Sequence, residues 1–274
     1  MGLLEQRLRD HDVLIRLNAF LLSYFGWVGF GILYGVIGRW SVDVTDQFLR
    51  LPLTSKAFVM WLVSFTHSIP PLYFLFRGVY YIGFAGSIAL IVAYLLIYRA
   101  DLQASDELLV RYLMAYGTAG AIYLAFHIYA PHVVYNLPGY SSGNTLLTRQ
   151  EFVFPSLHNT FAAINIITLW KYRDRLGGKL LILVNALVPF ATVFLAHHWV
   201  YDVIAGILLG ALISAYSEGW RARISRELYR MEITSLQRIT ALNVLLALIV
   251  LIIALDPQRA VALMGSILNR PSSP

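Results

Sequence analysis

The chain contains no cysteine, and only 13% of its 274 residues are charged. The absence of cysteine excludes disulfides, thiolate metal sites and a cysteine nucleophile. Soluble domains are about 25% charged and about 45–50% apolar, whereas this chain is 58% hydrophobic with a mean hydropathy of +0.66. Too few polar side chains remain to cover a water-soluble body. The composition excludes a soluble enzyme, a disordered protein and a nucleic-acid-binding module, and it indicates an integral membrane protein.

Apolar runs of the length that crosses a bilayer, about 20 residues, recur along the sequence. They cover residues 17–37, 79–98, 112–130, 156–172, 180–197, 202–217 and 235–255. The stretch 57–76 is also apolar, but His67 and the pair Pro70-Pro71 interrupt it. Proline removes a helix hydrogen bond and clashes with the preceding turn, so this stretch is ambiguous.

The sequence shows no repeat or linker, so we expect one all-α membrane domain over residues 1–274. It comprises an amphipathic lead-in over 1–16, a catalytic core of six helices within 17–217, and an additional span over 235–255. Gly206 and Gly210 are spaced i, i+4, a small-residue pattern that favours close helix packing.

Basic residues gather in four clusters, and such clusters favour the cytoplasmic side of a membrane. The clusters are Arg7/Arg9/Arg16, Arg99/Arg111, Lys171/Arg173/Arg175/Lys179 and Arg221/Arg223/Arg226/Arg230. They all face the cytoplasm only if 57–76 does not cross. We therefore expect 40–76 to be an outer, partly interfacial segment broken at Pro70-Pro71, with loops 131–155 and 197–201 also outside. The alternative is that 57–76 crosses and the N-terminus lies outside.

One candidate site opens the span 156–172, in the sequence Phe154–Asn159 (FPSLHN). Pro155 signals a helix start, and the free N–H groups and positive dipole of a helix N-terminus attract anions. His158 lies in that first turn. The Ser156 hydroxyl and nearby backbone N–H groups are further candidate donors to a bound anion.

A second candidate site is the turn His197–Asp202 (HHWVYD). His198 and Asp202 are spaced i, i+4 and share a face of a helix. A carboxylate that accepts from one imidazole nitrogen leaves the other free as nucleophile or base. His197 points about 100° away on a helix and is a secondary candidate. The His-His pair with Asp202 is also a conceivable metal site, but the HExxH-type signature is absent, so we expect neither metal nor cofactor.

Two further residues are candidates for substrate binding. Arg149 lies just before the FPSLHN turn and would neutralise a phosphate, with an interfacial anchor as the alternative. Asn136 would bind a polyol through hydrogen bonds. His127 and His132 flank Pro131 at a predicted helix end, where they would line a head-group site or have a structural role.

Taken together, the segments FVFPSLHNTF and TVFLAHHWVYD resemble the second and third motifs of the type 2 phosphatidic acid phosphatase superfamily. The resemblance covers about residues 112–217 and implies a six-helix core with its site on the outer face. Within the superfamily, the sequences of these two motifs are most similar to the inositol phosphorylceramide synthase branch, and the sphingomyelin synthases are more distant relatives. The segment Tyr135–Gly139, followed by Gly143 and Leu147–Arg149, also resembles that branch.

The sequence departs from the phosphatase pattern in three ways that favour the transferase branch. The phosphate-binding first motif, KxxxxxxRP, is absent, and only three lysines are present. Ala191 and Thr192 stand where the phosphatases carry Ser-Arg, and Leu157 replaces the glycine of the second motif.

The resemblance implies a role for each residue of the two motifs. His198 attacks phosphorus to form a phosphohistidine, Asp202 orients it, and His158 protonates the leaving oxygen and then activates the acceptor hydroxyl. The donor is a phospholipid with a phosphoinositol-like head group, and the acceptor is a lipid alcohol. In the alternative, a lipid phosphate phosphatase, water replaces the alcohol. A transporter would need charges along a membrane pathway, and the midspan segments are nearly charge-free.

Overall fold

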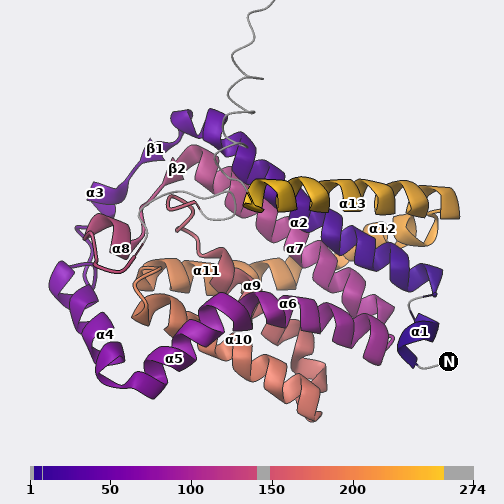
Figure 1. The fold of residues 1–274 in the computed structure, drawn as a ribbon, viewed down its shortest axis with the longest axis horizontal. Coiled ribbons are helices and arrows are strands. Elements are labelled where there is room, and N and C mark those ends of the chain that lie inside the picture. The colour runs from indigo at the N-terminus through magenta and orange to yellow at the C-terminus, as the bar shows by residue number, and fades with distance from the viewer. Residues whose placement is uncertain (1–2, 8, 141–148, 256–274) are drawn as a thin grey trace, which may run out of the picture.

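The computed structural model describes residues 3–7, 9–140 and 149–255, and this part of the chain is almost wholly helical (Figure 1). In chain order the elements are α1 (Leu3–Arg7), α2 (His11–Ile37), β1 (Val42–Asp43), α3 (Thr45–Phe48), α4 (Lys56–Ser68), α5 (Pro70–Gly78), α6 (Phe84–Ala93), α7 (Leu102–Ala125), β2 (Phe126–His127), α8 (Pro131–Val134), α9 (Leu157–Leu169), α10 (Leu176–Phe194), α11 (Val200–Tyr216), α12 (Glu218–Tyr229) and α13 (Ile233–Leu255). Single 3-10 turns occupy Gly38–Trp40 and Trp170–Tyr172, and π-helical turns occupy Val79–Gly83 and Tyr94–Tyr98. Gly143 and Leu147–Thr148 of the predicted loop lie outside the described residues.

Five helices of the described chain are long and apolar enough to cross a membrane. They are His11–Trp40, Pro70–Tyr98, Leu102–Ala125, Leu176–Phe194 and Ile233–Leu251. The pair α11 and α12, bent by 66°, makes a sixth if it counts as one span. These helices confirm the predicted all-α membrane fold. Helix α9 has only 13 residues, about 20 Å at 1.5 Å per residue, and it packs among α7, α10 and α11.

The region around Pro70 differs from the expected outer segment 40–76. Residues 70–76 begin the long span helix, since α5 continues through a π-helical turn into α6. Proline is tolerated in a first helical turn, where its missing N–H has no partner to lose. The helical conformation is interrupted at Ile69, which ends α4 and precedes α5, and α4 has only 13 residues. The stretch 57–76 is therefore two helix segments and not one span.

Helix α7 also differs from the expected span 112–130. It begins at Leu102, where the Asp101 side chain caps it by accepting from the Ala104 N–H at 2.9 Å. It ends at Ala125, because β2 follows and pairs in parallel with β1. The other expected spans coincide in position with α2, α9, α10, α11 and α13, with shifted ends. Of these helices, α9 is shorter than the expected span 156–172 and is not a candidate span, and α11 counts as one only together with α12. The latter part of the lead-in, from His11, already belongs to α2.

Two arginines of the basic clusters are buried in the bundle. Arg16 is fully buried and donates to both carboxylate oxygens of Asp106, at 2.7 and 3.0 Å, which ties α2 to α7. Arg111 is 6% exposed and donates to the hydroxyls of Thr168 and Ser217. Both side chains therefore stabilise helix packing in addition to adding positive charge.

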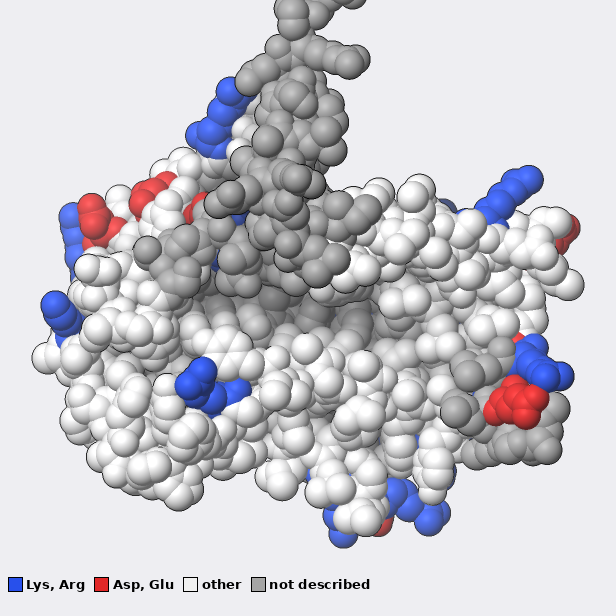
Figure 2. Space-filling view, viewed as in Figure 1, with Lys and Arg blue, Asp and Glu red and all other residues white. Residues whose placement is uncertain are grey.

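The long helices α2, α6, α7 and α13 run along the long axis of the molecule (Figure 1). The elements β1, β2, α3, α4 and α8 gather at one end, and α1 and α12 lie at the other. Most charged atoms on the face in Figure 2 lie near its edges, one blue cluster lies inside its left half, and the rest of the described surface is largely white. Such an uncharged surface is typical of a region that faces lipid.

Helices α9 and α11 pack very closely, as the glycine spacing predicted. A Cβ on Gly206 would lie 2.5 Å from the carbonyl oxygen of Ser156, and one on Gly210 would lie 2.6 Å from that of Thr160. Only glycine permits this approach of two backbones. The contact brings the start of α9 beside the start of α11, where the two predicted motifs lie.

Candidate active site

The turn between α10 and α11 fixes the two adjacent histidines. The backbone N–H groups of His197 and His198 both donate to the carbonyl of Thr192, each at 3.0 Å. Ala196 has a φ of +53°, which lets the chain reverse directly after α10. The Asp202 carboxylate accepts from the backbone N–H of Trp199 at 2.7 Å and thereby caps α11.

The start of α9 is anchored from two sides. The Tyr123 hydroxyl donates to the carbonyl of Pro155 at 2.7 Å, and the Ser156 N–H donates to the carbonyl of Asp202 at 3.2 Å. The Ser156 side chain caps α9 by accepting from the backbone N–H of Asn159. These bonds hold His158, in the first turn of α9, next to the histidine turn.

The structure brings the three main candidate residues together in a row. Nε2 of His198 lies 3.4 Å from Nδ1 of His158, and Nδ1 of His198 lies 3.5 Å from Oδ2 of Asp202. The His198 side chain is 4% exposed and that of Asp202 is fully buried. One nitrogen of His198 therefore faces a carboxylate and the other faces an acid–base group, which is the arrangement a histidine nucleophile needs.

The electrostatic surroundings keep the histidines of the turn neutral. Burial lowers the pKa of His198 to about 3, opposed by the backbone of Val153 and assisted by His132. Burial, together with the neighbouring imidazoles of His132, His198 and His158, lowers the pKa of His197 to about 2. A neutral imidazole keeps a lone pair. The surroundings of His198 therefore favour the form that a nucleophile needs.

His158, His197 and His198 line a cavity of about 720 Å³. Its other lining residues are mainly aromatic or polar: Trp27, His67, Tyr73, Arg77, Tyr80, Tyr81, Phe84, Ala85, Ala130, His132, Pro138, Gly139, Tyr140, Arg149, Gln150, Phe152, Val153, Leu157 and Leu195. Two arginines and no carboxylate appear among these described residues. The cavity therefore suits an anion.

The four secondary candidates occupy different places. Arg149 lines the cavity, and its Nε and Nη2 donate to the carbonyl of Gly31 at 3.2 and 2.9 Å. His197 also lines it and stacks on Tyr80 with ring centroids 4.1 Å apart. Ser156 is buried as the cap of α9 and is absent from the cavity lining. Asn136 is exposed outside the lining, with the positive φ of a turn residue, +48°.

The helix that starts at Pro70 contributes residues to the site that the two sequence motifs did not predict. Arg77 lines the cavity, donates to the Tyr73 hydroxyl at 3.2 Å and lies 5.7 Å from the ring centroid of Tyr81. The Tyr81 hydroxyl lies 3.5 Å from Nε2 of His197. An isolated arginine in an apolar stretch is itself a signal for function, and it was available in the sequence.

The minor histidine candidates divide between the cavity and the scaffold. His132 lines the cavity, and Nδ1 of its ring lies 2.9 Å from the carbonyl of Ala196. His127 lies in β2, with Nδ1 3.0 Å from the Ser41 hydroxyl, and is absent from the lining. His132 therefore belongs to the site and His127 to the structure around it.

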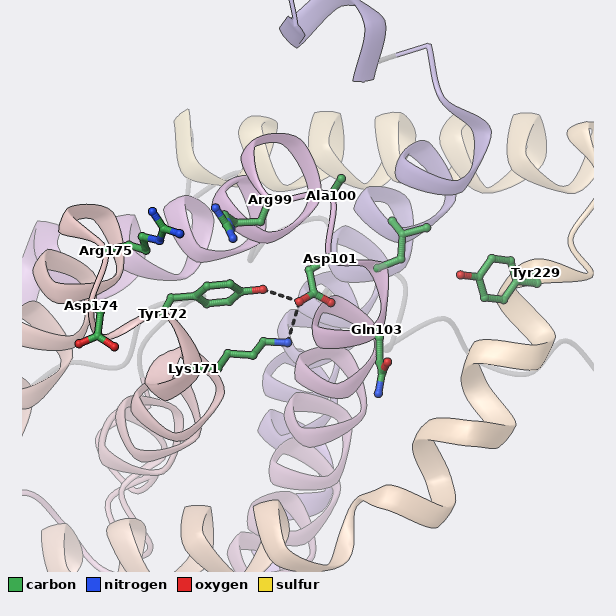
Figure 3. A pocket seen from close by; sticks show the side chains of 10 residues that line it. Arg99, Ala100, Asp101, Gln103, Lys171, Tyr172, Asp174, Arg175 and Tyr229 are labelled. Atoms are coloured by element: carbon green, nitrogen blue, oxygen red, sulfur yellow. Dashed lines mark hydrogen bonds and ion pairs between the residues drawn. The ribbon is translucent and has the colours of Figure 1, made fainter.

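A larger cavity of about 930 Å³ lies at the opposite end of α7, beside Asp101 (Figure 3). Lys171 and Tyr172 point at the Asp101 carboxylate, and the Lys171 Nζ lies 2.6 Å from it. Burial by itself would raise the pKa of Asp101, but these two hydrogen bonds lower it below its usual value. The Asp101 carboxylate is thus already paired with Lys171 while it caps α7. The candidate histidines line the other cavity, so this larger cavity is not the candidate active site. Among the residues that the structure describes, no group of three or more acidic or histidine side chains is arranged to hold a metal ion.

Comparison with known proteins identifies the class. The family model of the PAP2 superfamily, the type 2 phosphatidic acid phosphatases, matches residues 47–216, and the chain belongs to this superfamily. Its members are phosphatases and phosphotransferases, so the protein is an enzyme of this kind. An uncharacterized protein of Methanocaldococcus jannaschii is 26% identical over 221 residues, covering 80% of this chain and 90% of the relative. No solved structure matches the chain.

Proposed function

We propose that the protein is a membrane phosphotransferase that moves a phospho-alcohol head group from a phospholipid to a lipid hydroxyl. The observation that carries this proposal is the row Asp202–His198–His158, which opens on a cavity with two arginines and no described carboxylate. The phosphatidylinositol-like donor, the ceramide-like acceptor and the inositol phosphorylceramide synthase branch rest on the resemblance of the two motifs.

In the first step, Nε2 of His198 attacks the phosphorus of the donor lipid. The nitrogen–phosphorus bond forms while the bond to the lipid oxygen breaks. His158, which takes up a proton when the anionic phosphate binds beside it, donates that proton to the leaving oxygen. Asp202 accepts the Nδ1–H of His198 and stabilises the positive charge that develops on the ring. The head group is then held on His198 as a phosphohistidine, and the diacylglycerol leaves as a neutral alcohol.

In the second step, His158 removes the proton from the hydroxyl of the acceptor lipid. The acceptor oxygen attacks phosphorus, the nitrogen–phosphorus bond breaks, and His198 returns to its neutral form. One group serves as acid and then as base because the second step reverses the proton transfer of the first. General acid–base catalysis of this kind contributes about 10²–10⁴-fold.

Positive charge for the phosphate comes from the two arginines of the cavity. Arg149 is held in place by two bonds to the Gly31 carbonyl, and arginine geometry suits phosphate oxygens. Arg77 bonds only to a neutral phenol, so its charge is not neutralised by a described carboxylate. The two arginines take over the charge compensation of the absent KxxxxxxRP motif.

The test uses purified protein in detergent micelles with phosphatidylinositol labelled in the head group. With a long-chain lipid alcohol present, the label should appear on that alcohol, and little label should be released without it. Release of inositol phosphate at a rate independent of the alcohol would show a hydrolase and defeat the transferase assignment. His198→Ala should abolish turnover, and the matched control His127→Ala, at a histidine outside the cavity, should retain it.

A further inference from the structure

A second groove, apolar and of about 490 Å³, lies between α2, α7 and α12. It is lined by Ala19, Leu22, Ser23, Gly26, Trp27, Phe30, Leu109, Leu113, Tyr116, Gly117, Ile224 and Leu228. No charged side chain is among these described residues. The Ser23 hydroxyl donates to the carbonyl of Phe20 at 2.7 Å, so its proton needs no hydrogen-bond acceptor from a ligand. The groove fits a ligand that has no polar groups.

Two glycines open this groove toward the outside of the bundle. A Cβ on Gly26 or on Gly117 would meet no atom within 4 Å. Both residues are exposed, as is Leu113 between them in the lining. In a membrane protein this opening faces lipid, so a hydrocarbon chain enters the groove from the side without crossing water.

The groove and the histidine cavity share one residue, Trp27. On the groove side, its ring stacks on Tyr116 with centroids 4.9 Å apart. On the cavity side, its centroid lies 5.7 Å from that of Phe152, which lines the cavity with His198. One aromatic ring therefore separates a mainly apolar groove from a polar, positively charged site. A lipid has the same division between chain and head group.

The length of the groove also suits a lipid chain. Its lining on α2 extends from Ala19 to Phe30, about 16 Å at 1.5 Å per residue. On α7 the lining residues 109, 113, 116 and 117 share one face of the helix, which runs alongside the lining residues of α2. The shape is a trough parallel to the two helices and, since these cross the membrane, parallel to the chains of the bilayer.

We infer that the groove holds one hydrocarbon chain of the lipid donor while its phosphate reaches His198 past Trp27. This inference rests on the proposed function and adds the place where the substrate is anchored. Burial of each methylene favours binding, so the enzyme selects donors with chains long enough to fill the trough. If the groove held only a bulk lipid and not the donor, turnover would not depend on the chain length of the donor, because the bound chain would not be joined to the reacting phosphate.

The first experiment fills the groove and compares two donors that carry the same head group. Gly26→Leu and Gly117→Leu place a side chain in open space, and leucine is the better helix former. We expect kcat/KM to fall about tenfold or more for a dioleoyl donor and less than about twofold for a dihexanoyl donor. The matched control is Gly29→Leu, since Gly29 lies on the same helix in equally open space but outside the lining. It should leave both donors unchanged.

Equal losses on the two donors, or none on either, would overturn the inference. If the wild-type protein turns over neither donor, the proposed function fails instead, and a binding measurement then decides on the groove. In this cysteine-free chain, Ser23→Cys places a single thiol in the groove. The dioleoyl donor should slow its maleimide labelling, and the dihexanoyl donor should not. Equal labelling rates would also overturn the inference.

Discussion

At the scale of single residues, Asp202 combines a structural contact with the contact to His198 that the proposed mechanism uses. Its Oδ2 accepts the Trp199 N–H as the cap of α11, and the same oxygen faces Nδ1 of His198. Both contacts need an acceptor at this point, but only the second needs a negative charge. The Asp202 side chain is fully buried, so a negative charge on it would act on the imidazole with little screening.

The amide Asp202→Asn separates the two contacts. Asparagine keeps an oxygen that accepts the Trp199 N–H from the third position of the helix, so the thermal midpoint should change little, whereas kcat should fall by about 10²–10⁴-fold because the imidazolium loses its counter-charge. Asp202→Ala should lose this hydrogen bond as well, at a cost of about 1 kcal/mol of stability. The measurement is kcat together with the melting temperature. Unchanged kcat in the asparagine variant would contradict the orienting role.

Arg77 tests the charge of the cavity. The residue is exposed, and its hydrogen bond goes to a phenol, so Arg77→Ala should leave the melting temperature unchanged. We expect kcat/KM to fall by about tenfold or more, mainly through KM, and Arg77→Lys to restore part of it. The control is Arg39→Ala, which removes an arginine stacked on Trp40 outside the cavity. Equal kinetics for the two alanine variants would exclude Arg77 from substrate binding.

At the scale of elements, the contact between α9 and α11 determines the site. His158 belongs to the first turn of α9, Asp202 belongs to the first turn of α11, and His198 lies in the turn just before α11. Their distances therefore depend on how closely the two helices approach. That approach requires the two glycines of α11, where an added Cβ would collide with backbone oxygens.

Gly206→Ala should separate the two helices near the histidines. Alanine raises helix propensity by about 1 kcal/mol, but its Cβ would lie 2.5 Å from the Ser156 carbonyl, and overpacking typically costs about 1–3 kcal/mol. We expect a lower melting temperature and a large loss of kcat, because the cap of α9 moves. Gly219→Ala, on α12 in open space, should do neither. A stable, fully active Gly206→Ala protein would contradict the packing argument.

At the scale of the whole molecule, the two ends differ in chemistry. The end with α3, α4 and α8 carries the histidine cavity, and the end with α1 and α12 carries the Asp101–Lys171 pair. The basic clusters favour the cytoplasm for the latter end. We therefore propose that the active site opens on the non-cytoplasmic face, where its lipids are reached from the outer leaflet.

The absence of cysteine allows this orientation to be measured directly. Gln47→Cys in α3 and Asp174→Cys before α10 place single thiols at exposed positions near the two ends. In intact cells a membrane-impermeant maleimide should label the first and not the second, which should react only after the membrane is opened. The reverse pattern would place the active site on the cytoplasmic side.

Much of the site was predictable because its signals are local. Composition alone indicated a membrane protein. The spacing of His198 and Asp202 predicted that the two side chains meet, but His198 lies in the turn before α11 and not on the helix itself. The outer segment was wrong at residues 70–76, since a proline pair serves equally to end one helix and to begin the next. The buried roles of Arg16 and Arg111 were missed because their partners are remote in sequence: Asp106 lies 90 residues from Arg16, and Ser217 lies 106 from Arg111.

The sequence by itself determined the membrane class and the superfamily motifs, and it predicted the candidate reacting groups, because apolar content and helix-end chemistry are properties of short segments. Only the tertiary structure decided that Arg77 joins Arg149 at the cavity and that Ser156 is occupied as a cap. It also decided that Trp27 lies between the polar cavity and the apolar groove. These outcomes depend on which helix faces meet, and that depends on the packing of the whole bundle.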